Sequence, residues 1–179
     1  MKAIKYLTLL LLCLVVGCSP NTPDKPQHVS SGKVYSQLDI INFCATFKKA
    51  NSYIENSNNY LGYAEVNSQW IDGFYKRWRL DAESKHLVWD SKFCCIYFSV
   101  LCIGDAGAEF LNDETDTHMQ VQGIAMFMME YVPEGSLGND AHAIIMFLTE
   151  RGPVYLDPQV GIVTLTKKEV ASTFKLEIF

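Results

Sequence analysis

A histidine and an aspartate bracket a predicted β-hairpin in the C-terminal part of the sequence. His142 opens an apolar run, a turn containing Gly152 follows, and a second run ends at Asp157. Side chains that face each other across two antiparallel strands lie within contact distance. A carboxylate beside an imidazole orients the ring and stabilises its protonated form. The spacing therefore predicts a histidine–aspartate pair that could move a proton.

A cysteine could supply the nucleophile for such a pair. Cys95 lies at the start of an apolar segment, where a helix N-terminus would favour the reactive thiolate. Cys94 is the alternative nucleophile, because it occupies the neighbouring position. The indole of Trp89 and the amide of Gln159 could support the site, the indole N–H by donating to an oxyanion. Together these residue types predict thiol-dependent cleavage or transfer of an amide bond.

Each of these residues also has a purely structural explanation. Buried cysteines commonly act as small apolar side chains, and a histidine at a strand start is often an edge or loop residue. Asp157-Pro158 is a common turn start, and Trp89 could be a core aromatic. The coincidence of residue types, chain order and predicted elements favours the chemical interpretation.

The elements that must position these residues predict an α+β fold. The apolar spacing predicts helices over 35–51 and 66–80, and a buried helix from about 94 to 103. Strands are predicted over 118–132, in the hairpin 143–149 and 154–157, and over 162–165. Thr166 and Glu169 form a capping box for a short last helix. The expected architecture is N-terminal helices and a buried central helix packed on an antiparallel sheet.

Three short motifs carry a resemblance to a known family. They are an aromatic-x-Cys-x-x-aromatic-small motif (Phe93, Cys95, Phe98, Ser99), His142-Ala143, and Asp157-Pro158-Gln159. The sequence from about 89 to 165 thereby resembles the transglutaminase-like branch of papain-fold cysteine peptidases. The resemblance implies that Cys95 is the nucleophile, His142 the base and Asp157 the orienting residue. The acidic residues usual beside the family's cysteine are missing, since Cys94, Ile96 and Tyr97 stand there.

The N-terminus resembles a bacterial lipoprotein signal. Residues 1–17 combine Lys2 and Lys5 with an apolar stretch that is too short to span a bilayer. Gly17-Cys18 ends it as a lipobox would, so Cys18 is expected to be acylated, for example with palmitate. Residues 18–32 read as a flexible tether and 33–179 as the folded domain. Ser19 after the cysteine favours the outer membrane, with the protein facing the periplasm.

The composition of the sequence limits the kinds of partner that the protein is expected to bind. Removing Lys2 and Lys5 leaves 13 basic residues against 20 acidic ones, a net charge near −7. This charge argues against nucleic acid as a partner. No metal-site spacing and no cofactor motif is present, so neither a metal nor a cofactor is expected. Cys44, Cys94, Cys95 and Cys102 remain in the domain, and a bridge from Cys44 to Cys94 or Cys102 stays open.

Two functions follow from the sequence. The first is an envelope lipoprotein that acts as a thiol-dependent peptidase, amidase or acyltransferase on an envelope protein or a cell-wall peptide. The second is a catalytically degenerate lipoprotein that binds or inhibits another envelope component, as an inhibitor or exclusion factor would. In both, acylated Cys18 holds the protein on a lipid bilayer.

Overall fold

A mixed β-sheet forms the centre of the molecule. The structure, a computed structural model, describes residues 28–53, 61–88, 94–113, 121–136 and 140–179. Cys18, Trp89 and Phe93, which the sequence analysis singled out, lie outside these residues. The described strands are β1 (Ser30–Tyr35), β2 (Asn51–Tyr53), β3 (Gly62–Val66), β4 (Val121–Ile124), β5 (Met126–Tyr131), β6 (His142–Thr149), β7 (Gly152–Asp157), β8 (Gly161–Val163) and β9 (Lys175–Ile178).

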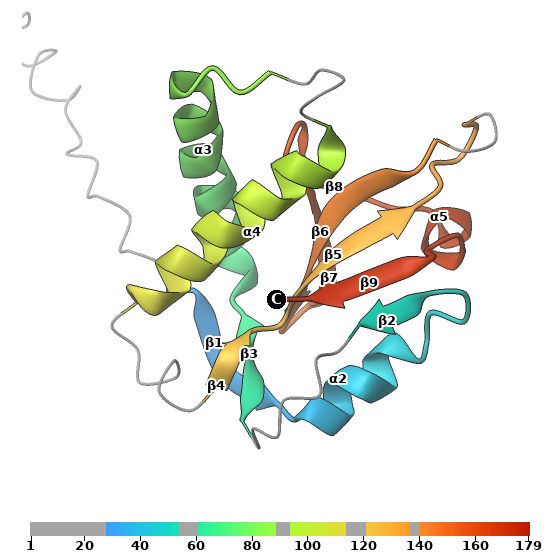
Figure 1. Cartoon of the computed structure of the whole chain (residues 1–179). Helices are drawn as coiled ribbons and strands as arrows, with labels where there is room; N and C mark the ends of the chain where they lie inside the picture. The colour runs from blue at the N-terminus through green and yellow to red at the C-terminus, as the bar shows by residue number, and fades with distance from the viewer. Residues whose placement is uncertain (1–27, 54–60, 89–93, 114–120, 137–139) are drawn as a thin grey trace, which may run out of the picture.

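The main strand order is β1-β3-β6-β5-β9-β2, with β4 paired to β3 and β7 between β6 and β8. The β1/β3, β5/β6, β5/β9, β6/β7 and β7/β8 pairs are antiparallel. The β2/β9, β3/β4 and β3/β6 pairs are parallel. The C-terminal strand β9 therefore lies inside the sheet, between β5 and β2 (Figure 1).

Both faces of the sheet are buried, because the central strands are apolar at successive positions. Along β6, Ile145 and Phe147 face one core cluster, whereas Ile144 and Met146 face the other. Side chains that alternate between two covered faces give a continuous apolar run. The helices that cover these faces are α2 (Gln37–Cys44), α3 (Ser68–Ser84), α4 (Cys95–Leu111) and α5 (Lys167–Ala171).

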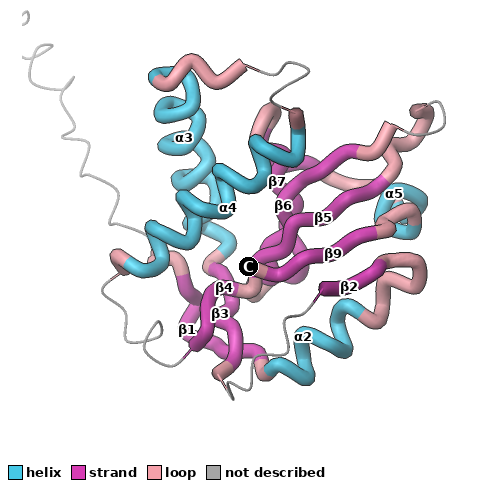
Figure 2. Tube along the Cα trace, in the orientation of Figure 1, coloured by secondary structure: helices cyan, strands magenta, loops and turns pink. Residues whose placement is uncertain are grey.

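The helices divide between the two faces. Side chains of α3 and α4 belong to the first cluster, and α2 contributes Ile40 and Cys44 to the second. Figure 2 shows α3 and α4 together on one side of the strands, with α2 and α5 away from them. Reciprocal capping boxes start two of the helices: Ser36 with Asp39 for α2, and Thr166 with Glu169 for α5. The second box lies where the sequence predicts it.

The expected fold class is wrong in its sheet and in its N-terminal part. The sheet is mixed and has nine strands among the described residues, instead of being antiparallel with helices before it. β1, β2 and β3 come from segments in which no strand was predicted, and β1 begins at Ser30, within the expected tether. These strands are short and polar or glycine-containing, and they owe their stability to distant partners. Local periodicity therefore does not reveal them.

Two details of the expected elements also change. The helix expected to be buried on all sides is α4, and its Ile96, Tyr97, Val100 and Leu101 side chains are exposed. The strand expected over 118–132 divides into β4 and β5, which have different partners. The expected hairpin is present as β6 and β7. None of the described helices is both long enough and apolar enough to span a membrane.

Candidate functional site

The β6–β7 hairpin places His142 beside Asp157. His142 Nε2 lies 2.7 Å from Asp157 Oδ2, and both side chains are mostly shielded from solvent. The backbone N–H of Gln159 donates to the other carboxylate oxygen, Oδ1, at 2.9 Å. The Asp-Pro-Gln turn thus holds the carboxylate from one side while the imidazole meets it from the other. The expected histidine–aspartate pair is formed.

Cys95 is the first residue of α4, and Cys94 is its N-cap residue. One helical turn further along, Ser99 Oγ donates to the carbonyl oxygen of Ala143 at 3.2 Å. Residues four apart share a helix face, so Cys95 lies on the face of α4 that contacts the start of β6. Since His142 directly precedes Ala143, the structure brings the helix start toward the histidine.

Tyr131 completes the surroundings of the pair. Its ring packs edge-on against the His142 ring, with centroids 5.9 Å apart. Burial, with smaller contributions from the nearby Glu169, Asp157 and Cys95, raises the pKa of Tyr131 to about 12. The phenol therefore stays neutral. It acts as an apolar wall with one polar atom, and the sequence analysis did not identify it.

The four described cysteines are free thiols, so neither bridge that the sequence left open is present in the structure. Burial raises the pKa of Cys44 to about 11, and burial together with Asp105 raises that of Cys102 well above its usual value. Cys94 and Cys95 are only half-buried. They are therefore the accessible thiols of the described part of the chain.

Two further residues, Gln159 and Trp89, were predicted to support the site. Gln159 contributes its backbone N–H to Asp157, and its carbonyl accepts from Arg79 at 3.1 Å. Trp89 lies outside the described residues. Within the described residues, no group of three histidine, cysteine, aspartate or glutamate side chains is placed to hold a metal ion.

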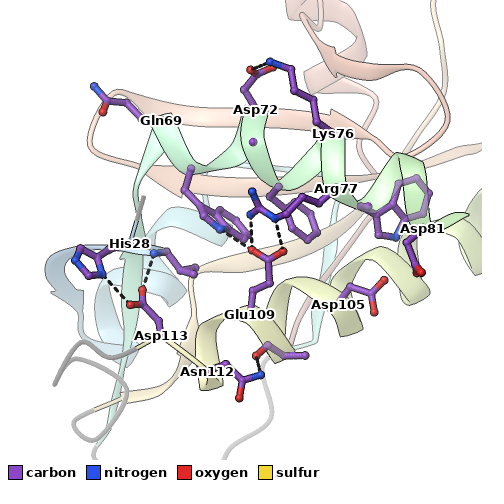
Figure 3. Close-up of a pocket in the computed structure, with 16 residues that line it drawn as sticks. His28, Gln69, Asp72, Lys76, Arg77, Asp81, Asp105, Glu109, Asn112 and Asp113 are labelled. Atoms are coloured by element: carbon purple, nitrogen blue, oxygen red, sulfur yellow. Dashed lines mark hydrogen bonds and ion pairs between the residues drawn. The ribbon is translucent and has the colours of Figure 1, made fainter. Parts of the chain in front are cut away.

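A second candidate site is a cleft of about 1290 Å³ between α3 and α4. Figure 3 shows Arg77 of α3 and Glu109 of α4 pointing toward each other across it. Arg77 donates to both Glu109 oxygens, at 3.0 and 2.6 Å, and the Trp70 indole N–H adds a third bond at 2.9 Å. This clamp ties the two helices together.

Further polar side chains line the same cleft. Asp113 accepts hydrogen bonds from the His28 ring and from the backbone N–H of Val29, at 2.8 and 2.7 Å. Asp105 makes no hydrogen bond with a described residue. Partial burial raises the pKa of Asp105, and Asp81 and Glu109 add to this against the opposing effect of Lys85. The cleft thus keeps an acceptor available for a ligand.

The sequence does not predict this cleft, although it contains one signal. Asp105 and Glu109 are four residues apart, which places them on one face of α4, and Asp113 follows just after the helix ends. An acidic stripe on a helix usually faces solvent, so the spacing alone does not indicate a cleft. Only the packing of α3 beside α4 makes these carboxylates part of the wall of a cleft.

Comparisons with known proteins show a likeness in fold. No family model matches the sequence, and no curated protein matches it. A solved structure described as the PSL1a–E64 complex matches with a TM-score of 0.58 and 13% identity, over 81% of this chain and 51% of that one. A Polyporus squamosus lectin bound to the human-type influenza-binding epitope Neu5Acα2-6Galβ1-4GlcNAc matches with a TM-score of 0.55 and 15% identity, over 81% and 49%.

The chain thus spans about half the length of each matched structure, and identities this low show the fold alone. The comparisons correct the expected membership of the transglutaminase-like and papain-fold superfamily, because the matched structures are named for a lectin and for PSL1a. The expected peptidase, amidase or acyltransferase activity falls with it. Short motifs are a weak guide here, since a cysteine at a helix start near a histidine–aspartate pair recurs on unrelated folds.

Proposed function

We propose that the chain binds a saccharide in the cleft between α3 and α4. The cleft itself carries the proposal: it is large enough for several sugar units, and its lining combines carboxylates with a guanidinium group and indoles. Saccharide hydroxyls both donate and accept hydrogen bonds, so they suit such a lining. Support also comes from the likeness in fold to a structure that is named as a lectin bound to a glycan.

The charge of the cleft favours a neutral saccharide. Among the lining residues, acidic side chains outnumber lysine and arginine by five to two: Asp72, Asp81, Asp105, Glu109 and Asp113 against Lys76 and Arg77. Three ion pairs are already formed within this set or beside it, by Lys76 with Asp72, Arg77 with Glu109 and Lys85 with Asp81. A sialylated glycan would bring a further negative charge close to Asp105 and Asp113, which costs binding energy.

A glycan array followed by titration calorimetry tests the proposal. We expect neutral glycans such as Galβ1-4GlcNAc to bind more tightly than their α2-6 sialylated counterparts. The Asp105→Asn variant should weaken binding about tenfold or more, because it removes an ionised acceptor. Asp140→Asn serves as the matched control, since Asp140 is an exposed aspartate outside the cleft lining.

Two results would overturn saccharide binding in this cleft. One is an array on which no glycan binds at protein concentrations on the order of 0.1 mM. The other is equal loss, or equal retention, of binding in the Asp105→Asn and Asp140→Asn variants, which would place the saccharide elsewhere.

We also propose that Cys95 is a nucleophilic thiol whose ionisation His142 assists. The 2.7 Å contact between His142 and Asp157 favours this second function, because an oriented imidazole can accept a thiol proton. The bond from Ser99, one turn after Cys95, to Ala143 ties the same part of α4 to the strand that starts at His142. The proposal assigns the thiol reactivity toward electrophiles and no amide-cleaving activity.

Alkylation with iodoacetamide, followed by peptide mass spectrometry, tests the thiol. The sulfur attacks the methylene carbon and iodide leaves, so the product adds a carbamidomethyl group to Cys95. We expect Cys95 to react faster than Cys44 and Cys102 in the folded protein, and His142→Ala to slow it about tenfold or more. Equal rates in the wild type and in His142→Ala would contradict assistance by the histidine, and Cys94→Ala shows which neighbour carries the label.

We propose that acylated Cys18 holds the domain on the outer membrane, facing the periplasm, and that its saccharide or protein partner is an envelope component. The lipobox-like sequence before Cys18 supports this placement.

A further inference from the structure

A separate apolar pocket lies at the other side of the molecule from the α3–α4 cleft. It occupies about 470 Å³ between the turn that follows α2 and the helix α5. Its apolar lining includes Phe47, Leu165 and Val170, which are half-buried. Phe47 and Leu165 also pack against the second core cluster, so the floor of the pocket belongs to the folded core.

Three lysines surround this pocket. Lys48 and Lys49 come from the turn after α2, and Lys167 is the first residue of α5. All three are exposed, and none forms an ion pair with a described residue. Lys168 differs, because its ammonium group lies 2.9 Å from Glu134. Because no described carboxylate pairs with these three lysines, they give this pocket a positive charge that favours an anionic ligand.

We propose that this pocket binds a free fatty acid, with the acyl chain on Phe47, Leu165 and Val170 and the carboxylate among Lys48, Lys49 and Lys167. Burial of the acyl chain provides most of the binding free energy, at roughly 25 cal/mol per Å² of apolar surface removed from water. The lysines provide the preference for a negative head group. A pocket of this volume takes one acyl chain. A two-chain phospholipid would therefore leave its second chain in water.

Titration calorimetry with decanoate, below the concentration at which it forms micelles, tests the proposal. We expect decanoate to bind at least tenfold more tightly than decyltrimethylammonium, which has the same chain and the opposite charge. Acetate, which has only the head group, should not bind measurably. The combined variant Lys48→Gln, Lys49→Gln and Lys167→Gln should weaken decanoate binding at least tenfold.

Lys168→Gln is the matched control, because it removes one positive charge from the same helix but from a lysine that is already paired. It should change the affinity less than threefold, and circular dichroism should show that both variants fold. Equal affinity for decanoate and decyltrimethylammonium, or equal effects of the triple and control variants, would overturn the proposal. Binding to phosphatidylglycerol vesicles without binding to decanoate would also overturn it, since the lysines would then contact a bilayer surface.

Discussion

A buried carboxylate shows how single residues in this fold depend on their partners. Glu65 of β3 is buried, and it accepts hydrogen bonds from Ser31, Lys33 and Tyr35 at 2.8, 2.9 and 2.6 Å. Burial alone would raise the pKa of Glu65, but these three donors outweigh it and lower the pKa below its usual value of 4.5. The ionised form is therefore stabilised by folding.

The Glu65→Gln variant should lower the free energy of unfolding by about 2 kcal/mol at pH 7, because an amide cannot accept from all three donors. The native pKa is depressed, so the stabilisation is present above about pH 4.5 and is lost as the pH falls through the native pKa. The gap between variant and wild type should therefore narrow in acid. Urea denaturation at several pH values measures this, with exposed Glu83→Gln as the control. A gap that does not change with pH would contradict it.

Two glycines should respond to alanine in opposite ways. A methyl group on Gly62 would lie 2.6 Å from Val34 Cγ1 and closer still to the Tyr35 carbonyl oxygen, whereas one on Gly104 of α4 would meet nothing. Gly62→Ala should destabilise the protein by about 2 kcal/mol through strain between β1 and β3. Gly104→Ala should stabilise it by up to about 1 kcal/mol through helix propensity. Thermal denaturation of both variants would show shifts of the same sign if this reasoning fails.

At the scale of elements, the helix α4 connects the two candidate sites. Its first residue, Cys95, lies one turn before Ser99, which bonds to Ala143 at the start of the hairpin, while its C-terminal half carries Asp105 and Glu109 of the α3–α4 cleft. Its inner face packs in the first core cluster through Phe98, Cys102 and Phe110. One helix therefore positions both candidate sites, and the two sites lie at opposite ends of it.

The clamp between α3 and α4 should show measurable coupling. Arg77 meets Glu109 through two hydrogen bonds, and Glu109 is only one-third exposed. A double-mutant cycle with Arg77→Met and Glu109→Gln should give a coupling free energy of about 1 kcal/mol. The exposed pair of Lys76 and Asp72 within α3 should give about 0.3 kcal/mol. Similar coupling free energies for the two pairs would show that the Arg77–Glu109 pair is no stronger than an ordinary exposed ion pair.

At the scale of the whole molecule, the C-terminal strand β9 lies inside the sheet. β9 pairs with β5 on one side and with the early strand β2 on the other, so it links the two ends of the described chain. Leu176, in its middle, is 1% exposed and belongs to the second core cluster. Folding therefore has to bring distant parts of the sequence together before this cluster is complete.

Leu176→Ala should lower the free energy of unfolding by about 3 kcal/mol, because it leaves a cavity in the core. Ile162→Ala, on the edge strand β8, should cost less than about 1 kcal/mol, since Ile162 is half exposed. Chemical denaturation compares the two. Equal losses would mean that β9 adds no more to the core than the edge of the sheet does.

The proposed anchor is tested on the intact chain in a bacterial host. Labelling with radioactive palmitate should mark the wild type and not the Cys18→Ser variant, because the proposal makes the lipobox-like cysteine the acceptor. The variant should move from the membrane fraction to the periplasmic fraction. Label retained in Cys18→Ser would contradict the anchor.

Local signals in the sequence predicted several parts of this structure. The alternating and apolar runs around Gly152 predicted the β6–β7 hairpin, and with it the meeting of His142 and Asp157. Thr166 and Glu169 predicted the start of α5. These features depend on residues within one turn or one hairpin, so a short window of sequence contains the physical information that they need.

Only the tertiary structure decided the rest. The parallel pairing of β2 with β9, the mixed sheet and the cleft between α3 and α4 depend on contacts between residues far apart in the chain. Whether Asp105 and Glu109 face open solvent or a cleft depends on where α3 packs. The residues of α4 alone do not indicate the position of α3. The sequence by itself determined the β6–β7 hairpin, the capped start of α5 and the histidine–aspartate pair. Long-range packing determined the architecture and the surfaces that it encloses.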